Sequence, residues 1–326
     1  MKALIVDAPD APFRLEERLR PTPGPGEVLV RIEASGVNPL DTKIRAGAAA
    51  HARHPLPAVL GLDLAGLVEE VGAGVTGFRA GDAVYGMTGG VGGVQGSLAE
   101  YAAVDARLLA RKPANLSMRE AAALPLIVIT AWEGLVDRAG VRKGQAVLVQ
   151  GAAGGVGHVA VQIARAFGAR VYGTYRGPRE AMVRDLGAIP IDTDASSVAA
   201  YVDEHGDGQG FDLVYDTAGG PMLDASFEAV RRFGHVVSCL GWGTHALAPL
   251  SFKNGTYSGV FTLLPLLTGQ GGERHGEILA EAARLVEEGR LRPHLDPREF
   301  AFDAVGEAHD AITGRSAEGK VVVSIR

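Results

Sequence analysis

The chain has 326 residues, of which 47% are hydrophobic and 21% are charged, so its composition is that of a globular protein with about two domains. Its formal net charge of −6 at pH 7 argues against nucleic acid or an anionic membrane as a general partner. The single cysteine, Cys239, excludes an intrachain disulfide and any zinc site that needs two cysteines.

The apolar segments predict neither targeting nor membrane insertion. Residues 1–20 turn charged by residue 14 and lack the apolar core of a secretory signal. The longest apolar stretches, residues 121–132 and 259–267, contain proline and are shorter than the roughly 20 residues that span a bilayer. We therefore expect a cytoplasmic protein without a membrane partner.

Two patterns of elements follow one another along the chain. Residues 1–120 show short β segments separated by Gly, Pro and Asp, which is typical of a barrel-like β unit. From residue 123 to 263 strands alternate with helical patterns, including helices expected over 155–167 and 221–233, which predicts βαβ units and a parallel sheet. Further helices are expected over residues 276–290 and 305–313, and the closing strand KVVVSI is expected to return to the β unit. The fold class is α/β, with one domain formed by residues 1–122 and 264–326 and the other by residues 123–263.

The stretch GAAGGVG, residues 151–157, follows the apolar strand VLVQ and precedes a helical pattern. In this strand–turn–helix context, bare backbone at a helix N-terminus predicts binding of a dinucleotide pyrophosphate. Ala152 replaces the first glycine of G-x-G-x-x-G, which is tolerable if its φ is negative, and a plain βα turn is the alternative. The binding residues expected from this turn are Ala153, Gly154, Gly155, Val156 and Gly157.

The end of the second strand indicates which dinucleotide binds. An NAD site places Asp or Glu there, whereas GTYRGPRE offers Thr174 and Arg176 and no carboxylate before Glu180. An arginine can bind a 2′-phosphate, which an acid would repel. We therefore predict NADPH as cofactor, with Arg176 contacting the 2′-phosphate and Thr174 assisting; a solvated surface arginine is the alternative.

Several stretches together resemble a known superfamily. They are GVNPLDTKIRAG (36–47), LPAVLGLDLAGLVEEVGAGV (56–75), GSLAEYAAV (96–104), QGAAGGVGHVAVQIARAFGA (150–169) and GKVVVSI (319–325). In this order they resemble the medium-chain dehydrogenase/reductase superfamily, and within it the zinc-free quinone oxidoreductases related to zeta-crystallin. The resemblance implies a GroES-like β-rich catalytic domain, a Rossmann domain with a doubly wound parallel sheet, and a homodimer or homotetramer.

The resemblance also implies a site without metal. Where zinc-dependent alcohol dehydrogenases carry catalytic zinc ligands, this chain has Asn38, Leu62 and Leu126, and an amide with two leucines does not bind Zn²⁺. Asn38, Asp41 and Thr130 are expected to act in catalysis, although the turn-forming sequence Asn-Pro-x-Asp gives the first two a structural alternative. The stretch SCLG (238–241) should end a strand at the carboxyl edge of the sheet, so we expect the backbone of Cys239, Leu240 and Gly241, with that of Phe261, to line the nicotinamide. The resemblance adds Lys320 as a cofactor contact, with a surface lysine as the alternative.

The histidines and the missing tyrosine bear on the source of a proton. Relatives often carry a Tyr in the loop after the Asn-Pro motif, but residues 46–57 contain no Tyr. They contain His51 and His54, either of which could donate a proton near neutral pH, although we expect both to be mobile surface residues. We expect His158 on a helix surface and His235 packed in a strand.

Because a quinone tolerates hydride transfer without a metal and its product takes protons from water, the predicted function is NADPH-dependent reduction of a quinone. An NADPH-dependent enone or enoyl-thioester reductase is the first alternative, and both act on a small conjugated carbonyl compound. The second is a non-catalytic, NADPH-bound binding protein of the zeta-crystallin type.

Overall fold

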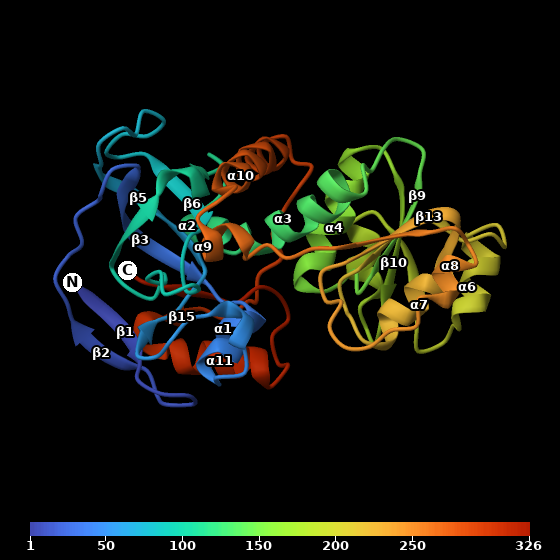
Figure 1. Ribbon diagram of the computed structural model, residues 1–326, viewed down its shortest axis with the longest axis horizontal. Coiled ribbons are helices and arrows are strands. Elements are labelled where there is room, and N and C mark those ends of the chain that lie inside the picture. Colours follow the sequence, from blue (N-terminus) through green and yellow to red (C-terminus); the bar gives the residue numbers. More distant parts are fainter. The chain divides into compact units, whose positions relative to one another are not determined.

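The computed structural model describes residues 1–326 and divides into two compact units (Figure 1). The β-rich unit comprises Met1–Ile129 and Leu263–Arg326, and the α/β unit comprises Thr130–Thr262. The sequence placed these boundaries after residues 122 and 263, whereas the structure divides the chain after Ile129, within helix α3 (Pro125–Trp132), and after Thr262. None of the helices is both long enough and apolar enough to cross a membrane.

The β-rich unit contains two sheets. One has the order β2-β1-β4, and the other has the order β15-β16-β3-β5-β6-β8 with β7 also paired to β3. The strands are β1 (Lys2–Val6), β2 (Arg14–Glu17), β3 (Glu27–Gly36), β4 (Ala58–Val59), β5 (Asp63–Val71), β6 (Ala83–Met87), β7 (Tyr101–Asp105), β8 (Leu109–Arg111), β15 (Phe300–Ala301) and β16 (Val322–Ser324). The last strand, β16, pairs antiparallel with β3, so the C-terminus returns to the first unit as predicted.

The β-rich unit also contains six α-helical segments. They are α1 (Pro39–Arg45), α2 (Met118–Ala122), the first part of α3, α9 (Leu264–Thr268), α10 (Gly272–Glu287) and α11 (Val305–Thr313). The apolar face of α10 is buried against β6 and β8, where the buried Tyr85 hydroxyl donates to the carbonyl of Leu279 at 2.6 Å. Helix α1 packs against α11, and its N-cap is Asn38.

The α/β unit is a doubly wound parallel sheet with the strand order β11-β10-β9-β12-β13-β14. Its strands are β9 (Ala146–Gln150), β10 (Arg170–Tyr175), β11 (Ile189–Asp192), β12 (Phe211–Asp216), β13 (Val230–Ser238) and β14 (Thr256–Gly259). Its helices are α4 (Gly155–Ala166), α5 (Glu180–Asp185), α6 (Val198–His205), α7 (Pro221–Ala229) and α8 (Ala248–Ser251). The strand order reverses between β9 and β12, the place where such sheets bind ligands.

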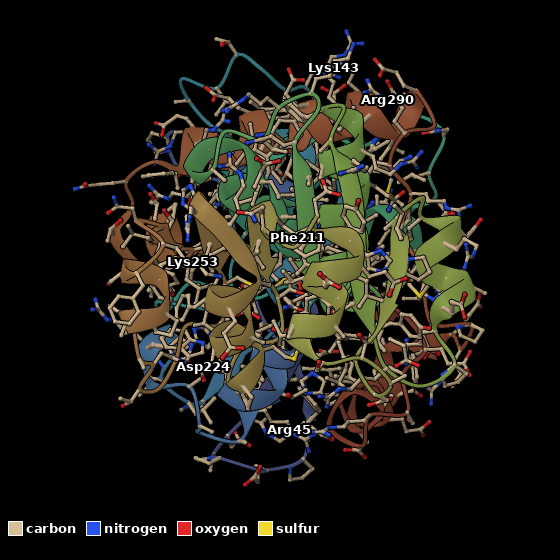
Figure 2. All side chains as sticks on the ribbon, turned by 90° about the vertical axis from the view of Figure 1, so that its right-hand side faces the viewer. Arg45, Lys143, Phe211, Asp224, Lys253 and Arg290 are labelled. Carbon is tan, nitrogen blue, oxygen red and sulfur yellow. The ribbon has the colours of Figure 1, made fainter.

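Apolar residues from strands and helices form the core of this unit. Phe211 lies at the start of β12 and is labelled in Figure 2. It is fully buried and packs edge-on to Tyr172, with 5.1 Å between the ring centroids. The helix expected over 221–233 was too long, because α7 ends at Ala229. Buried Val230 pairs with Phe211 as the first residue of β13, and Phe233 takes a φ of 59°, which a helix does not allow.

Candidate active site

The glycine-rich turn joins β9 to α4 in the α/β unit, as predicted. Gly151 takes the left-handed conformation with φ 74°, so Ala152 keeps a negative φ and the missing first glycine costs nothing. Helix α4 has Gly154 as N-cap and no capping side chain, and Gly154 and Gly155 are exposed. Its first N–H groups therefore have no acceptor in the chain, which suits a bound anion such as a pyrophosphate.

Gly157 lets the helix lie close to this turn. A Cβ atom at that position would stand 2.1 Å from the carbonyl oxygen of Gly151, well inside van der Waals contact. The same carbonyl accepts a hydrogen bond from Gly154 N at 2.9 Å. The residues around the turn thus fit the backbone approach that a dinucleotide requires.

The structure separates the roles of Thr174 and Arg176. Thr174 is buried, and its hydroxyl accepts from Gly151 N at 2.9 Å and donates to Gln150 Oε1 at 2.9 Å, so it supports the glycine turn from behind. Arg176 is largely exposed, and its Nε lies 3.6 Å from Asp194 Oδ1. Arg176 therefore remains able to turn toward a phosphate, whereas the Thr174 hydroxyl is already committed to the protein.

Asp216 organises the neighbouring strand ends. Its carboxylate ends β12, is fully buried, and accepts from Gly219 N at 2.9 Å and from Ser238 Oγ at 2.7 Å. The Ser238 hydroxyl in turn accepts from Leu240 N at 3.0 Å. Asp216 thereby shapes the loop at the switch point of the sheet, directly across from the end of β9.

The predicted residues after β13 and β14 lie at this carboxyl edge. Leu240 is half-buried, Gly241 is exposed, and Phe261 is 39% exposed and packs edge-on to Trp242. Burial raises the pKa of the Cys239 thiol to about 12, so this cysteine is not a thiolate nucleophile at neutral pH.

Thr130 lies where α3 passes into a π-helical segment, Glu133–Arg138. A π-helical turn leaves carbonyl groups without their usual helical partner. The hydroxyl of Tyr215 donates to the Thr130 carbonyl at 2.7 Å, and Tyr215 is fully buried. The backbone of Thr130 is therefore fixed within the α/β unit.

In the β-rich unit, Asn38 and Asp41 sit at the start of α1. Asn38 N donates to Asp41 Oδ2 at 2.8 Å, as the turn chemistry of Asn-Pro-x-Asp predicts. Both side chains are about 1% exposed, and Asp41 Oδ1 has no hydrogen-bond partner. Burial raises the pKa of Asp41 to about 7, although the hydrogen bond from Asn38 opposes the shift.

The amide of Asn38 joins two further buried charged groups. Asn38 Nδ2 donates to Asp63 Oδ2 at 2.9 Å, while Lys320 Nζ donates to Asn38 Oδ1 at 2.5 Å and to the Val37 carbonyl at 3.1 Å. Burial raises the pKa of Asp63 to about 6 against the charge of Lys320, and burial lowers the pKa of Lys320 against the attraction of both aspartates. We call Asn38, Asp41, Asp63 and Lys320 the buried polar cluster.

The three positions compared with zinc ligands come together around Asp63. Leu62 precedes it in the chain and is fully buried, Leu126 N donates to Asp63 Oδ1 at 3.0 Å, and Asn38 bonds the other oxygen. Among the three side chains, only the amide oxygen of Asn38 is an atom that could bind a metal. That oxygen already accepts a hydrogen bond from Lys320 Nζ. These residues do not fit a zinc ion, and no group of three or more His, Cys, Asp or Glu side chains is placed to hold a metal.

Two expectations about histidines need correction. His158 is 2% exposed rather than on a helix surface, because its ring turns back toward the Gly154 carbonyl at 3.1 Å. His54 lies 3.4 Å from the Val59 carbonyl through Nε2 and accepts from Gly93 N through Nδ1, and burial lowers its pKa. A neutral His54 that connects two loops is a poor proton donor. His235 packs in its strand and contacts Ser258 Oγ across the ladder at 2.9 Å.

Sequence reasoning missed Asp63 and Asp216. Each is a fully buried carboxylate within an apolar strand pattern, VLGLDLAGLV and LVYD. A charged residue in a buried strand requires a hydrogen-bonding or charged partner. An Asp within an apolar strand sequence was therefore the signal that could have indicated both residues.

Two family models match this chain. Residues 24–114 match the family model described as the alcohol dehydrogenase GroES-like domain, and residues 186–323 match the one described as zinc-binding dehydrogenase. The chain is 37% identical to 2-methylene-furan-3-one reductase of Solanum lycopersicum, over 91% of this chain and 71% of that protein. It is 34% identical to the chloroplastic NADPH-dependent alkenal/one oxidoreductase of Arabidopsis thaliana, over 91% and 72%.

A solved structure agrees with these matches. The alcohol dehydrogenase superfamily protein from Novosphingobium aromaticivorans is 62% identical and superposes with a TM-score of 0.98 over the whole length of both chains.

Proposed function

Because the chain belongs to the medium-chain dehydrogenase/reductase superfamily of oxidoreductases, in its quinone oxidoreductase-like branch, we propose that it reduces α,β-unsaturated carbonyl compounds with NADPH and without zinc. The observation that carries this proposal is the buried polar cluster. Among the three positions compared with zinc ligands, only Asn38 has a polar side chain, and its amide is hydrogen-bonded to the Asp63 carboxylate and the Lys320 ammonium group. This site therefore offers hydrogen bonds and charge in place of a Lewis acid.

NADPH, when bound, supplies the hydride. Gly154 and Gly155 at the start of α4 would hold its pyrophosphate, and Arg176 would hold its 2′-phosphate. Absence of a carboxylate at the end of β10 removes the group that would select a free ribose 2′-hydroxyl. The NADPH dependence named for the Arabidopsis relative supports this choice.

The substrate preference differs from the one favoured by the sequence. The sequence placed quinones first because no tyrosine in residues 46–57 could donate a proton. Two relatives that the chain matches over 91% of its length are named for a methylene-furanone and for alkenals and alkenones. Those names support the enone over the quinone. Quinone reduction stays as the second candidate, since a metal-free site suits it equally well.

The proposal is tested by steady-state kinetics with NADPH on a 2-alkenal, a vinyl ketone, an enoyl-thioester and 1,4-benzoquinone. We expect the vinyl ketone or alkenal to have a kcat/KM at least tenfold above that of the quinone. A kcat/KM for the quinone above those for the vinyl ketone and the alkenal would make quinone reduction the favoured function. If the enoyl-thioester had the highest kcat/KM, the protein would be assigned as an enoyl-thioester reductase. No turnover of any of them would contradict the enzymatic role.

A further inference from the structure

Asn38 is the expected donor to a substrate carbonyl, but an amide can act as a donor only if its nitrogen faces the right way. The two orientations of an Asn side chain differ by a rotation that exchanges oxygen and nitrogen, and only the surrounding groups choose between them. At this site the choice is made by two groups of opposite charge: Asp63 accepts from the nitrogen and Lys320 donates to the oxygen.

We propose that Lys320 and Asp63 are positioning residues that hold the amide of Asn38 in one orientation. In the reversed orientation the amide oxygen would face the Asp63 carboxylate and the amide nitrogen would face the Lys320 ammonium, so both hydrogen bonds would become repulsive contacts. With its oxygen occupied, Asn38 can offer a ligand only a donor, which suits a carbonyl or hydroxyl oxygen. Lys320 was expected to contact the cofactor, and this inference gives it a different role.

The backbone brings Lys320 to this place. Val37 N donates to the Val321 carbonyl at 2.9 Å, extending the pairing of β3 with β16, so Lys320 lies opposite the Val37–Asn38 peptide. On its other side Lys320 N donates to the His294 carbonyl at 2.8 Å. Gly319 is required for that approach, because a Cβ there would stand 2.5 Å from the carbonyl carbon of Leu295.

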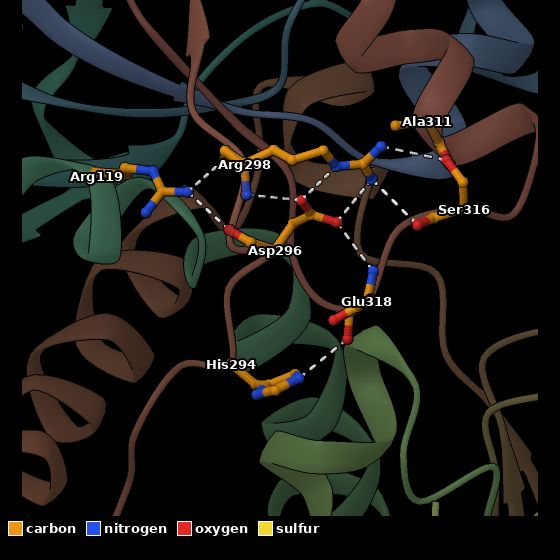
Figure 3. Close-up of polar contacts among 7 residues, drawn as sticks. All are labelled: Arg119, His294, Asp296, Arg298, Ala311, Ser316 and Glu318. Atoms are coloured by element: carbon orange, nitrogen blue, oxygen red, sulfur yellow. Dashed lines mark hydrogen bonds and ion pairs between the residues drawn. The ribbon is translucent and has the colours of Figure 1, made fainter. Parts of the chain in front are cut away.

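A second network fixes the segment that Lys320 pairs with (Figure 3). Asp296 N donates to the Lys320 carbonyl at 3.0 Å, and the buried Asp296 carboxylate accepts from Arg298 Nε at 2.7 Å and from Glu318 N at 2.9 Å. Arg119 Nη2 donates to the carbonyl of Asp296 at 2.7 Å. The Arg298 guanidinium holds the pKa of Asp296 well below its usual range, so this carboxylate stays ionised near neutral pH.

The two residues that hold the Asn38 amide carry opposite charges. Asp63 accepts two N–H groups, from Asn38 and Leu126, and donates none, as an ionised carboxylate does. A carboxylate in a fully buried site needs a counter-charge. Lys320 supplies it, because its positive charge lowers the pKa of Asp63. Removing Lys320 therefore leaves Asp63 without compensation and frees the Asn38 oxygen at the same time.

The test uses the full-length protein and four variants, with Asn38→Asp as a fifth for signal assignment. Lys320→Met removes the ammonium and Asp63→Asn removes the carboxylate charge. The double variant removes both charges, so that neither Asp63 nor Lys320 stays buried without the other if the single variants fold poorly. Ser97→Ala is the matched control, because Ser97 is buried in the same unit and bonds Ser35 Oγ at 2.7 Å without touching Asn38.

The first measurement is solvent exchange of the Asn38 side-chain amide by NMR on protein labelled with ¹⁵N-asparagine, with the signal assigned from Asn38→Asp. We expect slow exchange in the native protein and in Ser97→Ala, and at least tenfold faster exchange in Lys320→Met, Asp63→Asn and the double variant. Unchanged exchange in these variants would overturn the proposal.

The second measurement is kinetic and rests on the proposed function. Loss of an oriented donor acts on the transition state, so we expect kcat with a vinyl ketone to fall by about 10- to 100-fold, while the KM for NADPH changes less than twofold. Faster amide exchange with unchanged kcat would retain the positioning role and contradict the use of Asn38 on the substrate. Equal losses in kcat and NADPH affinity would instead restore Lys320 as a cofactor contact and overturn the proposal.

Discussion

The close contact at Gly157 gives a prediction whose size follows from the structure. In Gly157→Ala the new Cβ would lie 2.1 Å from the Gly151 carbonyl oxygen and 2.8 Å from its carbonyl carbon. Both are backbone atoms, so no side chain can move aside, and the turn and helix α4 must separate by more than about 1 Å to reach ordinary contact. Overpacking of this kind costs about 1–3 kcal/mol, which is about 5- to 150-fold when it acts on binding.

Gly154→Ala is the control for this substitution. Gly154 has φ −83° and ψ 176°, which alanine adopts freely, and its added Cβ would stand 3.1 Å from the same oxygen. Gly154 is also exposed at the uncapped end of α4. We therefore expect Gly154→Ala to weaken NADPH binding by obstructing the phosphate while leaving the thermal midpoint nearly unchanged.

The two variants are compared by calorimetric Kd for NADPH and by the thermal midpoint of the apoprotein. Gly157→Ala should raise the Kd about 5- to 150-fold and lower the midpoint by several degrees. A Gly157→Ala protein with native Kd and native midpoint would refute the reasoning. Equal loss of midpoint in both variants would show that the turn tolerates no Cβ anywhere, and the distance argument would fail.

Three further outcomes are expected. Arg176→Ala should raise the KM for NADPH at least tenfold and leave that for NADH within twofold, with the nearby Arg179→Ala as control; equal effects on both cofactors would count against the 2′-phosphate contact. His309 is 1% exposed, and burial lowers its pKa to about 4. As the pH falls below about 6.5, this histidine therefore takes up a proton in the unfolded chain but not in the folded protein. Stability should therefore fall between about pH 6.5 and 4, by about 3 kcal/mol in total, and His309→Leu should flatten that slope in chemical denaturation at a series of pH values. Light scattering should give twice or four times the 33.9 kDa of one chain, as the predicted homodimer or homotetramer requires, and a monomer would contradict that prediction.

Local patterns in the sequence were sufficient for most of the fold. Alternating strands and helices predicted the parallel sheet, and the Gly-rich turn predicted an uncapped helix N-terminus because both depend on neighbouring residues alone. Asn38 and Asp41 were likewise paired through a turn that spans four residues. Element ends were less certain, as α7 shows, because the burial of Val230 in a sheet outweighs its place in a helical pattern.

The buried polar cluster depended on tertiary structure. Asp63 is 25 residues from Asn38, and Lys320 is 282 residues from it, so no local period connects them. The sequence predicted functional roles for Asn38 and Lys320 but could not determine what they face, since that depends on the pairing of β16 with β3 and on the segment held by Asp296. Composition and spacing determine which helices and strands form. The partner of a buried charge is decided only when strands from opposite ends of the chain pair, because the charge is removed from water only then and needs a compensating group.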